Sequence, residues 1–204
     1  MADTSSWEER YARTDNYLFG TAPNVFLAAQ AHLLKPGMSA LTLADGEGRN
    51  GVWLAERGLD VLAVDFAPSA LRKAQALAER RGARLRFEQA DLGTWDWPDA
   101  SFDLVAAIFI QFSDPPQRQK IFAGIKRCLK PGGLLLMQGY RPEHLAYKDT
   151  KGGPPVVERC YTRALLDEAF SDFQSVAISE HDSRLEEGDL HVGMSALIDM
   201  VARK

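Results

Sequence analysis

A glycine-rich turn and the carboxylate that follows it carry the residue types in this chain that could do chemistry. Gly46 and Gly48 lie between an apolar run that ends near Ala44 and a helical segment that contains Gly51. Glycine lets a ligand approach the backbone where a Cβ would clash, and a helix start offers free N–H groups to polar atoms. Asp65 ends the next apolar run, where a carboxylate can take two hydrogen bonds from a ribose diol. The spacing predicts a nucleoside-cofactor site.

Composition narrows the class of protein. The chain has 204 residues and a net charge of −4, which fits one domain, residues 1–204, with no basic field for nucleic acid or a membrane surface. No apolar run is long enough to span a bilayer, and no apolar leader segment is visible. Cys128 and Cys160 are too few for a disulfide framework, and neither has metal-ligand spacing. We therefore expect a cytoplasmic protein without a metal site.

Strand and helix signals alternate five times, which predicts a parallel sheet with helices on both faces. The last two strands are joined by a polar turn region and predict an antiparallel hairpin. A segment of more than thirty residues, 1–37, precedes the first strand and is expected to form a helical lid. The expected strands are 39–44, 60–65, 84–89, 103–109, 134–139, about 173–180 and about 191–202. The expected helices are 5–14, 23 to about 35, 50–57, 68–82, 115–129 and 162–169.

The nature of the cofactor is a separate question. Residues 46–51 formally match G-x-G-x-x-G, the dinucleotide fingerprint, which alone is a weak signal. Three features argue against a nicotinamide dinucleotide: the long segment before the first strand, Asp91 after the third strand, and Leu129-Lys130-Pro131-Gly132-Gly133 before the fifth, followed by a terminal hairpin. A nicotinamide-dependent oxidoreductase stays open as the less favoured alternative.

With these residues in place, the chain resembles the class I S-adenosylmethionine-dependent methyltransferases over nearly its whole length. The resemblance implies an α/β, Rossmann-like, doubly wound three-layer sandwich whose seven-stranded, mainly parallel sheet has an antiparallel C-terminal strand. It implies that Gly46 and Gly48 wrap the methionine end of S-adenosylmethionine, that Asp65 holds the ribose and that Asp91 lies near the adenine amino group. The full expected cofactor set is Tyr17, Phe19, Gly20, Ala44, Asp45, Gly46, Gly48, Asn50, Asp65, Phe66, Asp91, Leu92 and Ile108.

Several of these residues also have plainer explanations. Tyr17 and Phe19 could close over the cofactor or pack as ordinary core aromatics. Asn50 could meet the cofactor carboxylate, cap its helix, or do both, and Asp91 could only stabilise its own turn.

Within the family, the chain resembles a small bacterial branch related to tellurite-resistance and thiopurine-type methyltransferases. The likeness is carried by Gly46 to Asn50, by Tyr17 to Asn24, and by Glu187, Gly188, His191 and Gly193. The chain departs from the family at Thr42, where an acid is usual, and at Ala44, where glycine is usual. An alanine there is tolerable if its φ is negative. Asp45 stands where Cys or Thr is frequent.

Methyl transfer from a sulfonium needs little acid–base chemistry, so no obligatory catalytic residue follows from the sequence. His191, Tyr140 and Gln111 are the candidates at the carboxyl edge of the sheet. A solvated turn histidine and a loop amide are the plainer alternatives for His191 and Gln111. We expect a small-molecule acceptor (a thiol, amine or oxyanion), with residues 7–22 and 140–160 capping the cleft. A non-catalytic S-adenosylmethionine-binding protein is the other alternative.

Overall fold

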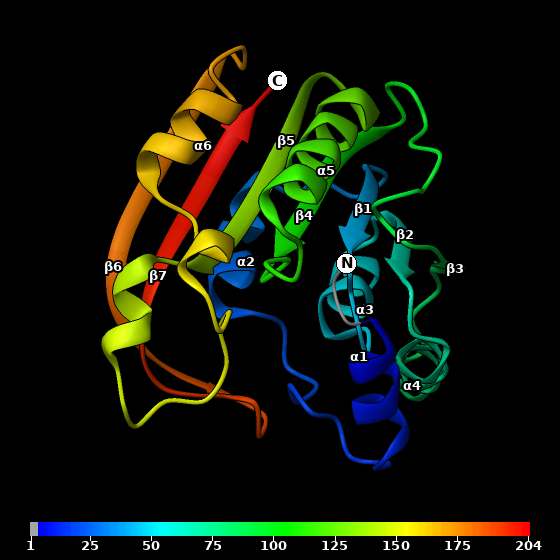
Figure 1. Cartoon of the computed structure of the whole chain (residues 1–204). Helices are drawn as coiled ribbons and strands as arrows, with labels where there is room; N and C mark the ends of the chain where they lie inside the picture. The colour runs from blue at the N-terminus through cyan, green and yellow to red at the C-terminus, as the bar shows by residue number, and fades with distance from the viewer. Residues whose placement is uncertain (1–3) are drawn as a thin grey trace.

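A single seven-stranded sheet organises the chain in the computed structural model, which describes residues 4–204 and the side chains from residue 7 onward (Figure 1). Its strand order is β3-β2-β1-β4-β5-β7-β6. Strands β1 to β5 pair in parallel, whereas β7 runs antiparallel to both β5 and β6. The bounds are β1 Ser39–Leu43, β2 Asp60–Asp65, β3 Arg86–Gln89, β4 Phe102–Ile108, β5 Leu129–Tyr140, β6 Ser175–Glu187 and β7 His191–Arg203.

Helices cover both faces of this sheet. Successive strand residues point to opposite faces, so Leu134 and Leu136 pack with α2 and α3, while Leu135 and Met137 pack with α5 and α6. Figure 1 shows α5 in front of the sheet and α2 behind it. The helices are α1 Thr4–Ala12, α2 Val25–Ala29, α3 Arg49–Glu56, α4 Pro68–Arg81, α5 Pro115–Cys128 and α6 Arg163–Ala169; short 3₁₀ turns are η1 Gln30–Leu33, η2 Pro142–Ala146 and η3 Val157–Arg159. The expected three-layer fold is confirmed.

Local sequence explains where the main elements begin. Strand β4 is almost wholly apolar and buried, as a strand covered on both faces must be. Asp114 caps α5 by accepting a hydrogen bond from Gln117 N, and Thr162 caps α6 by accepting one from Leu165 N. Helix α4 ends at Gly82, whose φ of +64° closes the helix in a left-handed residue.

Some boundaries differ from the sequence-based expectation. The second helix starts after Asn24, not at Pro23, because the Asn24 side chain accepts from Leu27 N, and the helix tightens into η1. Strand β6 continues to Glu187, since its polar side chains alternate with half-buried or buried ones along an edge strand. The connecting turn is therefore only residues 188–190.

The expected segment 1–37 holds α1, α2 and η1, and its first three residues lie outside the described part of the chain. The stretch 140–160, expected to be irregular, contains η2, η3 and an isolated antiparallel bridge between Lys151 and Val192. Within the described residues, no helix is both long enough and apolar enough to cross a membrane.

Candidate functional site

The carboxyl ends of β1, β2, β4 and β5 bring most of the expected site residues to one edge of the sheet. The neighbours β1 and β4 are where the strand order changes direction, and open α/β sheets bind ligands at such a point. The glycine-rich turn follows β1, Asp65 ends β2, and Tyr140 ends β5. The topology thus assembles this edge from segments far apart in sequence.

Two buried carboxylates hold the glycine-rich turn in shape. Asp65 Oδ2 accepts from Gly46 N at 2.8 Å and Oδ1 accepts from Ala67 N at 2.9 Å. Asp45 accepts from Gly51 N at 3.1 Å, which anchors the first turn of α3. Burial raises the pKa of Asp45 to about 7 and that of Asp65 to about 6. The turn is therefore organised by acids that burial makes unusually ready to take up protons.

The glycines of this turn face protein as well as the sheet edge. A Cβ added to Gly48, whose φ is +89°, would lie 2.7 Å from Ala74 Cβ and 2.9 Å from Ala74 Cα, so Gly48 is required by the close approach of α4. A Cβ added to Gly46 would lie 2.9 Å from the Tyr11 hydroxyl. Tyr11 of α1 therefore covers the glycine at which the methionine end of the cofactor is expected.

Ala44 lies in a strained conformation. Its φ is +46°, so the condition under which this alanine was expected to be tolerable, a negative φ, is not met. A side chain in the left-handed region costs about 1–2 kcal/mol relative to an ordinary helical conformation. Below it, Thr42 is buried and its Oγ1 has no hydrogen-bond partner. The two departures from the family pattern thus correspond to a strained backbone at Ala44 and an unpaired hydroxyl at Thr42.

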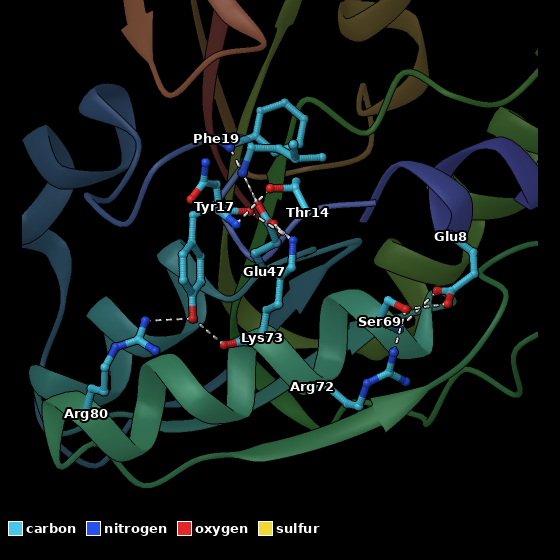
Figure 2. A network of polar contacts seen from close by, with 11 residues as sticks. Glu8, Thr14, Tyr17, Phe19, Glu47, Ser69, Arg72, Lys73 and Arg80 are labelled. Atoms are coloured by element: carbon cyan, nitrogen blue, oxygen red, sulfur yellow. Dashed lines mark hydrogen bonds and ion pairs between the residues drawn. The ribbon is translucent and has the colours of Figure 1, made fainter. Parts of the chain in front are cut away.

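The segment before α2 is fastened to the turn and to α4 (Figure 2). Glu47 accepts from Leu18 N at 2.7 Å and from Lys73 Nζ at 2.9 Å. The Tyr17 hydroxyl donates to Lys73 O at 2.8 Å and accepts from Arg80 Nη2 at 2.7 Å. These contacts give Tyr17 a docking function on α4.

The same segment, residues 17–20, also contacts the turn between β6 and β7. Leu18 O accepts from Asp189 N at 2.9 Å, and a Cβ on Gly20 would lie 3.4 Å from Gly188 N. The Phe19 ring lies 4.5 Å from the His191 ring, so Phe19 belongs to the sheet edge.

The three candidates for chemistry have different surroundings. Gln111 is fully engaged by backbone: its Nε2 donates to Tyr140 O at 2.9 Å and Arg159 O at 3.0 Å, and its Oε1 accepts from Tyr140 N. This matches the satisfied-amide alternative. His191 is only 8% exposed, so the solvated-turn alternative is wrong. Tyr140 is 1% exposed, and its hydroxyl has no partner.

A buried polar network links these residues to the glycine-rich turn. Arg49 Nη2 lies 2.8 Å from Glu187 Oε2, and His191 Nδ1 lies 3.1 Å from the same oxygen. Asn24 Nδ2 donates to Glu187 Oε1 at 3.0 Å and to Gln138 Oε1 at 2.7 Å. The sequence interpretation named Asn24 and Arg49 only as parts of a family likeness, and Glu187 also as a neighbour of His191 in sequence; it named none of them as a site residue. Nothing in their spacing shows that they meet.

The remaining expected cofactor residues are more dispersed. Asn50 is buried, and its Oδ1 accepts from Asn24 N at 2.9 Å. Asp91 is exposed and accepts from Gly93 N at 2.8 Å, the bond of a self-stabilised turn. Phe66 packs beside Tyr11 of α1. Leu92 and Ile108 belong to the two cores on opposite faces of the sheet.

Several known proteins with similar sequences are named as methyltransferases. Residues 40–133 match a family model described as a methyltransferase domain. The chain is 34% identical over 141 residues to a demethylmenaquinone methyltransferase of Thermus thermophilus, an alignment that covers 68% of this chain and 61% of that protein. It is 31% identical over 113 residues to an uncharacterized methyltransferase of Synechocystis, covering 54% of this chain and 51% of that protein. The chain thus spans less than two thirds of either relative.

Solved structures of methyltransferases share the fold of this chain. The N-methyltransferase NodS from Bradyrhizobium japonicum, in complex with S-adenosyl-L-homocysteine, superposes with a TM-score of 0.75 at 13% identity, covering 100% of this chain and 99% of that one. TehB from Haemophilus influenzae gives 0.72 at 18% identity, covering 97% and 67%. The chain has the fold of the class I S-adenosylmethionine-dependent methyltransferases. Its residues 40–133 match the methyltransferase domain.

Proposed function

We propose that this protein transfers a methyl group from S-adenosylmethionine to a small-molecule acceptor. The observation that carries the proposal is the hydrogen bond from Gly46 N to Asp65, which joins the glycine-rich turn to the acid that ends β2. The Asp65 carboxylate accepts from the backbone N–H groups of Gly46 and Ala67, and a carboxylate has about four acceptor sites. Asp65 can therefore still accept from the two ribose hydroxyls, so the residues present fit the cofactor.

The chain's own residues supply position and a dry environment. Bound S-adenosylmethionine supplies an activated methyl group, so the protein has to align the acceptor and exclude water. Phe19, Phe109 and His191 pack their rings together at the carboxyl edge, where they would shield the reacting atoms. Residues 7–22 form the cover that must shift for a ligand to reach Gly46, because Tyr11 lies over that glycine. Hydrogen exchange with and without S-adenosylhomocysteine would report this movement.

Calorimetric titration with S-adenosylmethionine and S-adenosylhomocysteine tests the proposal. Asp65→Asn leaves only one acceptor oxygen and should weaken binding by roughly 1.5–3 kcal/mol. Asp99→Asn is the matched control, because Asp99 is an exposed acid paired with Arg127 outside the site. Thermal unfolding of both variants separates lost affinity from lost fold. Equal affinity in wild type and Asp65→Asn would remove the ribose assignment.

Measurements on the same protein sample also test two alternative functions. A non-catalytic binding protein is favoured by the strain at Ala44 and the unpaired Thr42 Oγ1. Binding without turnover on a panel of thiols, amines and phenols would support it. A nicotinamide-dependent oxidoreductase has only the formal match at residues 46–51 in its favour, and tight binding of NADH would revive it. The tellurite-resistance and thiopurine-type branch is a narrower hypothesis, which turnover with oxyanions and thiols would test.

A further inference from the structure

Five aromatic rings gather where β4 and β5 end and β7 begins. This aromatic cluster consists of Phe19, Phe109, Tyr140, His144 and His191. Ring centroids lie 4.8 Å apart for Phe109 and Tyr140, 4.6 Å for Phe109 and His191, and 4.4 Å for Tyr140 and His144. The cluster stands at the edge of the sheet where this fold type binds ligands. His144 belongs to η2, and no sequence pattern predicted its position here.

Two polar atoms inside the cluster have no partner. Tyr140 Oη and His144 Nδ1 are buried and have no hydrogen-bond partner. The two residues are 1% and 3% exposed, respectively. An unpaired buried polar atom costs about 1–3 kcal/mol, and such atoms are few in native proteins. Two of them on rings in contact indicate a place where a ligand completes the hydrogen bonding.

The tautomer of His144 follows from its other nitrogen. His144 Nε2 lies 3.1 Å from Gly152 O, and a carbonyl oxygen only accepts, so Nε2 carries the hydrogen. Nδ1 therefore presents a lone pair. The Tyr140 hydroxyl can donate or accept. The missing ligand group must donate to Nδ1 and can accept from Tyr140, and a hydroxyl has both capacities.

A short glycine-containing segment covers the cluster. A Cβ on Gly152 would lie 2.9 Å from Tyr140 Oη, and one on Gly153 would lie 2.6 Å from His144 Cδ2. Lys151 N donates to Val192 O at 2.7 Å, and Val192 N donates to Lys151 O at 3.1 Å, which ties this cover segment, residues 149–153, to β7. A shift that breaks the two backbone bonds between Lys151 and Val192, but keeps the bond from His144 Nε2 to Gly152 O, would open a path to the cluster.

Charge next to the cluster is already balanced. Glu187 is paired with Arg49 at 2.8 Å and is also in contact with His191 Nδ1. A charged ligand moved into this buried position would lose its hydration without gaining an unpaired counter-charge. The ring walls favour flat apolar groups. These properties fit a neutral aromatic molecule with one hydroxyl.

On the basis of the proposed methyltransferase function, we infer that the aromatic cluster is the acceptor subsite, that it takes a neutral phenol, and that His144 Nδ1 receives the phenol proton. As the phenol oxygen bonds to the methyl carbon, the sulfur–methyl bond breaks, its electron pair stays on sulfur, and the proton passes to His144. The products are an aryl methyl ether and neutral S-adenosylhomocysteine, and the imidazolium returns its proton to solvent. Tyr140 donates to the phenol oxygen and orients it.

Binding of para-cresol to the full chain tests this inference, and para-methylanisole is the probe that cannot donate. We expect cresol to bind about tenfold or more tightly than methylanisole in calorimetry. Tyr140→Phe should weaken cresol binding about fivefold or more while leaving the melting temperature unchanged or higher, because the hydroxyl has no partner to lose. His144→Gln should have the same effect on affinity, since its amide can keep the donor to Gly152 O and lacks an acceptor at the Nδ1 position.

Tyr161→Phe is the control, because Tyr161 is equally buried and lies in the core beside α5. Its cresol affinity should equal that of wild type. No measurable cresol binding, equal affinity for cresol and methylanisole, or wild-type affinity in Tyr140→Phe would overturn the inference. S-adenosylhomocysteine affinity, measured on the same samples, reports separately on the proposed function. Cofactor binding without cresol selectivity removes only the phenol subsite, whereas loss of cofactor binding in wild type removes the methyltransferase itself.

Discussion

Arg49 and Glu187 form a buried ion pair, 2.8 Å between Nη2 and Oε2, although 138 residues separate them in the chain. The pair joins the first residue of α3 to the last residue of β6. It therefore fixes the glycine-rich turn relative to the C-terminal hairpin, and His191 shares the same carboxylate oxygen.

Removal of one member of this pair should lower the stability of the folded protein. Glu187→Gln leaves the Arg49 charge buried without its partner, and we expect the free energy of unfolding to fall by about 3 kcal/mol or more. Glu186→Gln is the matched control, because the neighbouring Glu186 makes an exposed pair with Arg184 and should change stability little. Urea unfolding of both variants is the measurement. A Glu187→Gln protein as stable as the control would contradict a structural role for the pair.

The titration of Asp45 should contribute to the pH dependence of the protein's stability. Burial raises its folded-state pKa from 3.8 to about 7, so between these values the folded chain binds a proton that the unfolded chain releases. Stability from this group is then present at low pH and is lost as pH rises from about 4 to about 7. Asp45→Asn keeps an acceptor for Gly51 N and should flatten this part of the profile, measured by denaturant unfolding across the range. An identical slope in wild type and variant would show that Asp45 does not titrate in this window.

Ala44→Gly should stabilise the protein. Relief of the positive φ is worth about 1–2 kcal/mol, and the added freedom of glycine in the unfolded chain offsets roughly 0.5–1 kcal/mol of this. Ala100→Gly is a matched control, because Ala100 has a φ of +41° in a loop remote from the turn. Both variants should melt higher than wild type, whereas only Ala44→Gly should change S-adenosylhomocysteine affinity. A lower melting temperature for Ala44→Gly would contradict the strain argument.

Gly48→Ala should destabilise the fold and not only weaken cofactor binding. The new Cβ would clash with Ala74 in α4. The alanine would also have to adopt a φ of +89°, which is strained for any residue with a side chain. Gly82→Ala isolates the second effect, because Gly82 has a φ of +64° and open space around its Cβ position. We expect Gly48→Ala to lose about 1–3 kcal/mol more than Gly82→Ala, the range for overpacked sites. Equal losses in thermal unfolding would show that α4 yields without cost.

The sequence predicted those parts of the molecule that depend on local pattern. Apolar strands and helix caps recur at regular spacing, and the carboxyl ends of parallel strands must meet, so the meeting of Gly46 with Asp65 was predictable. The pairing of Arg49 with Glu187 was not, because no local pattern connects residues so distant. His144 lay in a stretch expected to be irregular. The end of β6 was missed because its exposed polar residues are typical of both turns and edge strands.

The attachment of Leu18 to the β6–β7 turn has a consequence for the order of folding. Leu18 O accepts from Asp189 N and Leu190 N, so one attachment of residues 7–22 joins parts of the chain that are far apart in sequence. Contacts with so large a sequence separation form late, after the entropy of closing the intervening loop has been overcome. Among the attachments of this segment, the one to the β6–β7 turn should therefore form after those to the glycine-rich turn and α4. A chain stopped before residue 188 would therefore keep the contacts of Leu18 with Glu47 and of Tyr17 with α4, but it would lack the bond that ties Leu18 to the C-terminal hairpin.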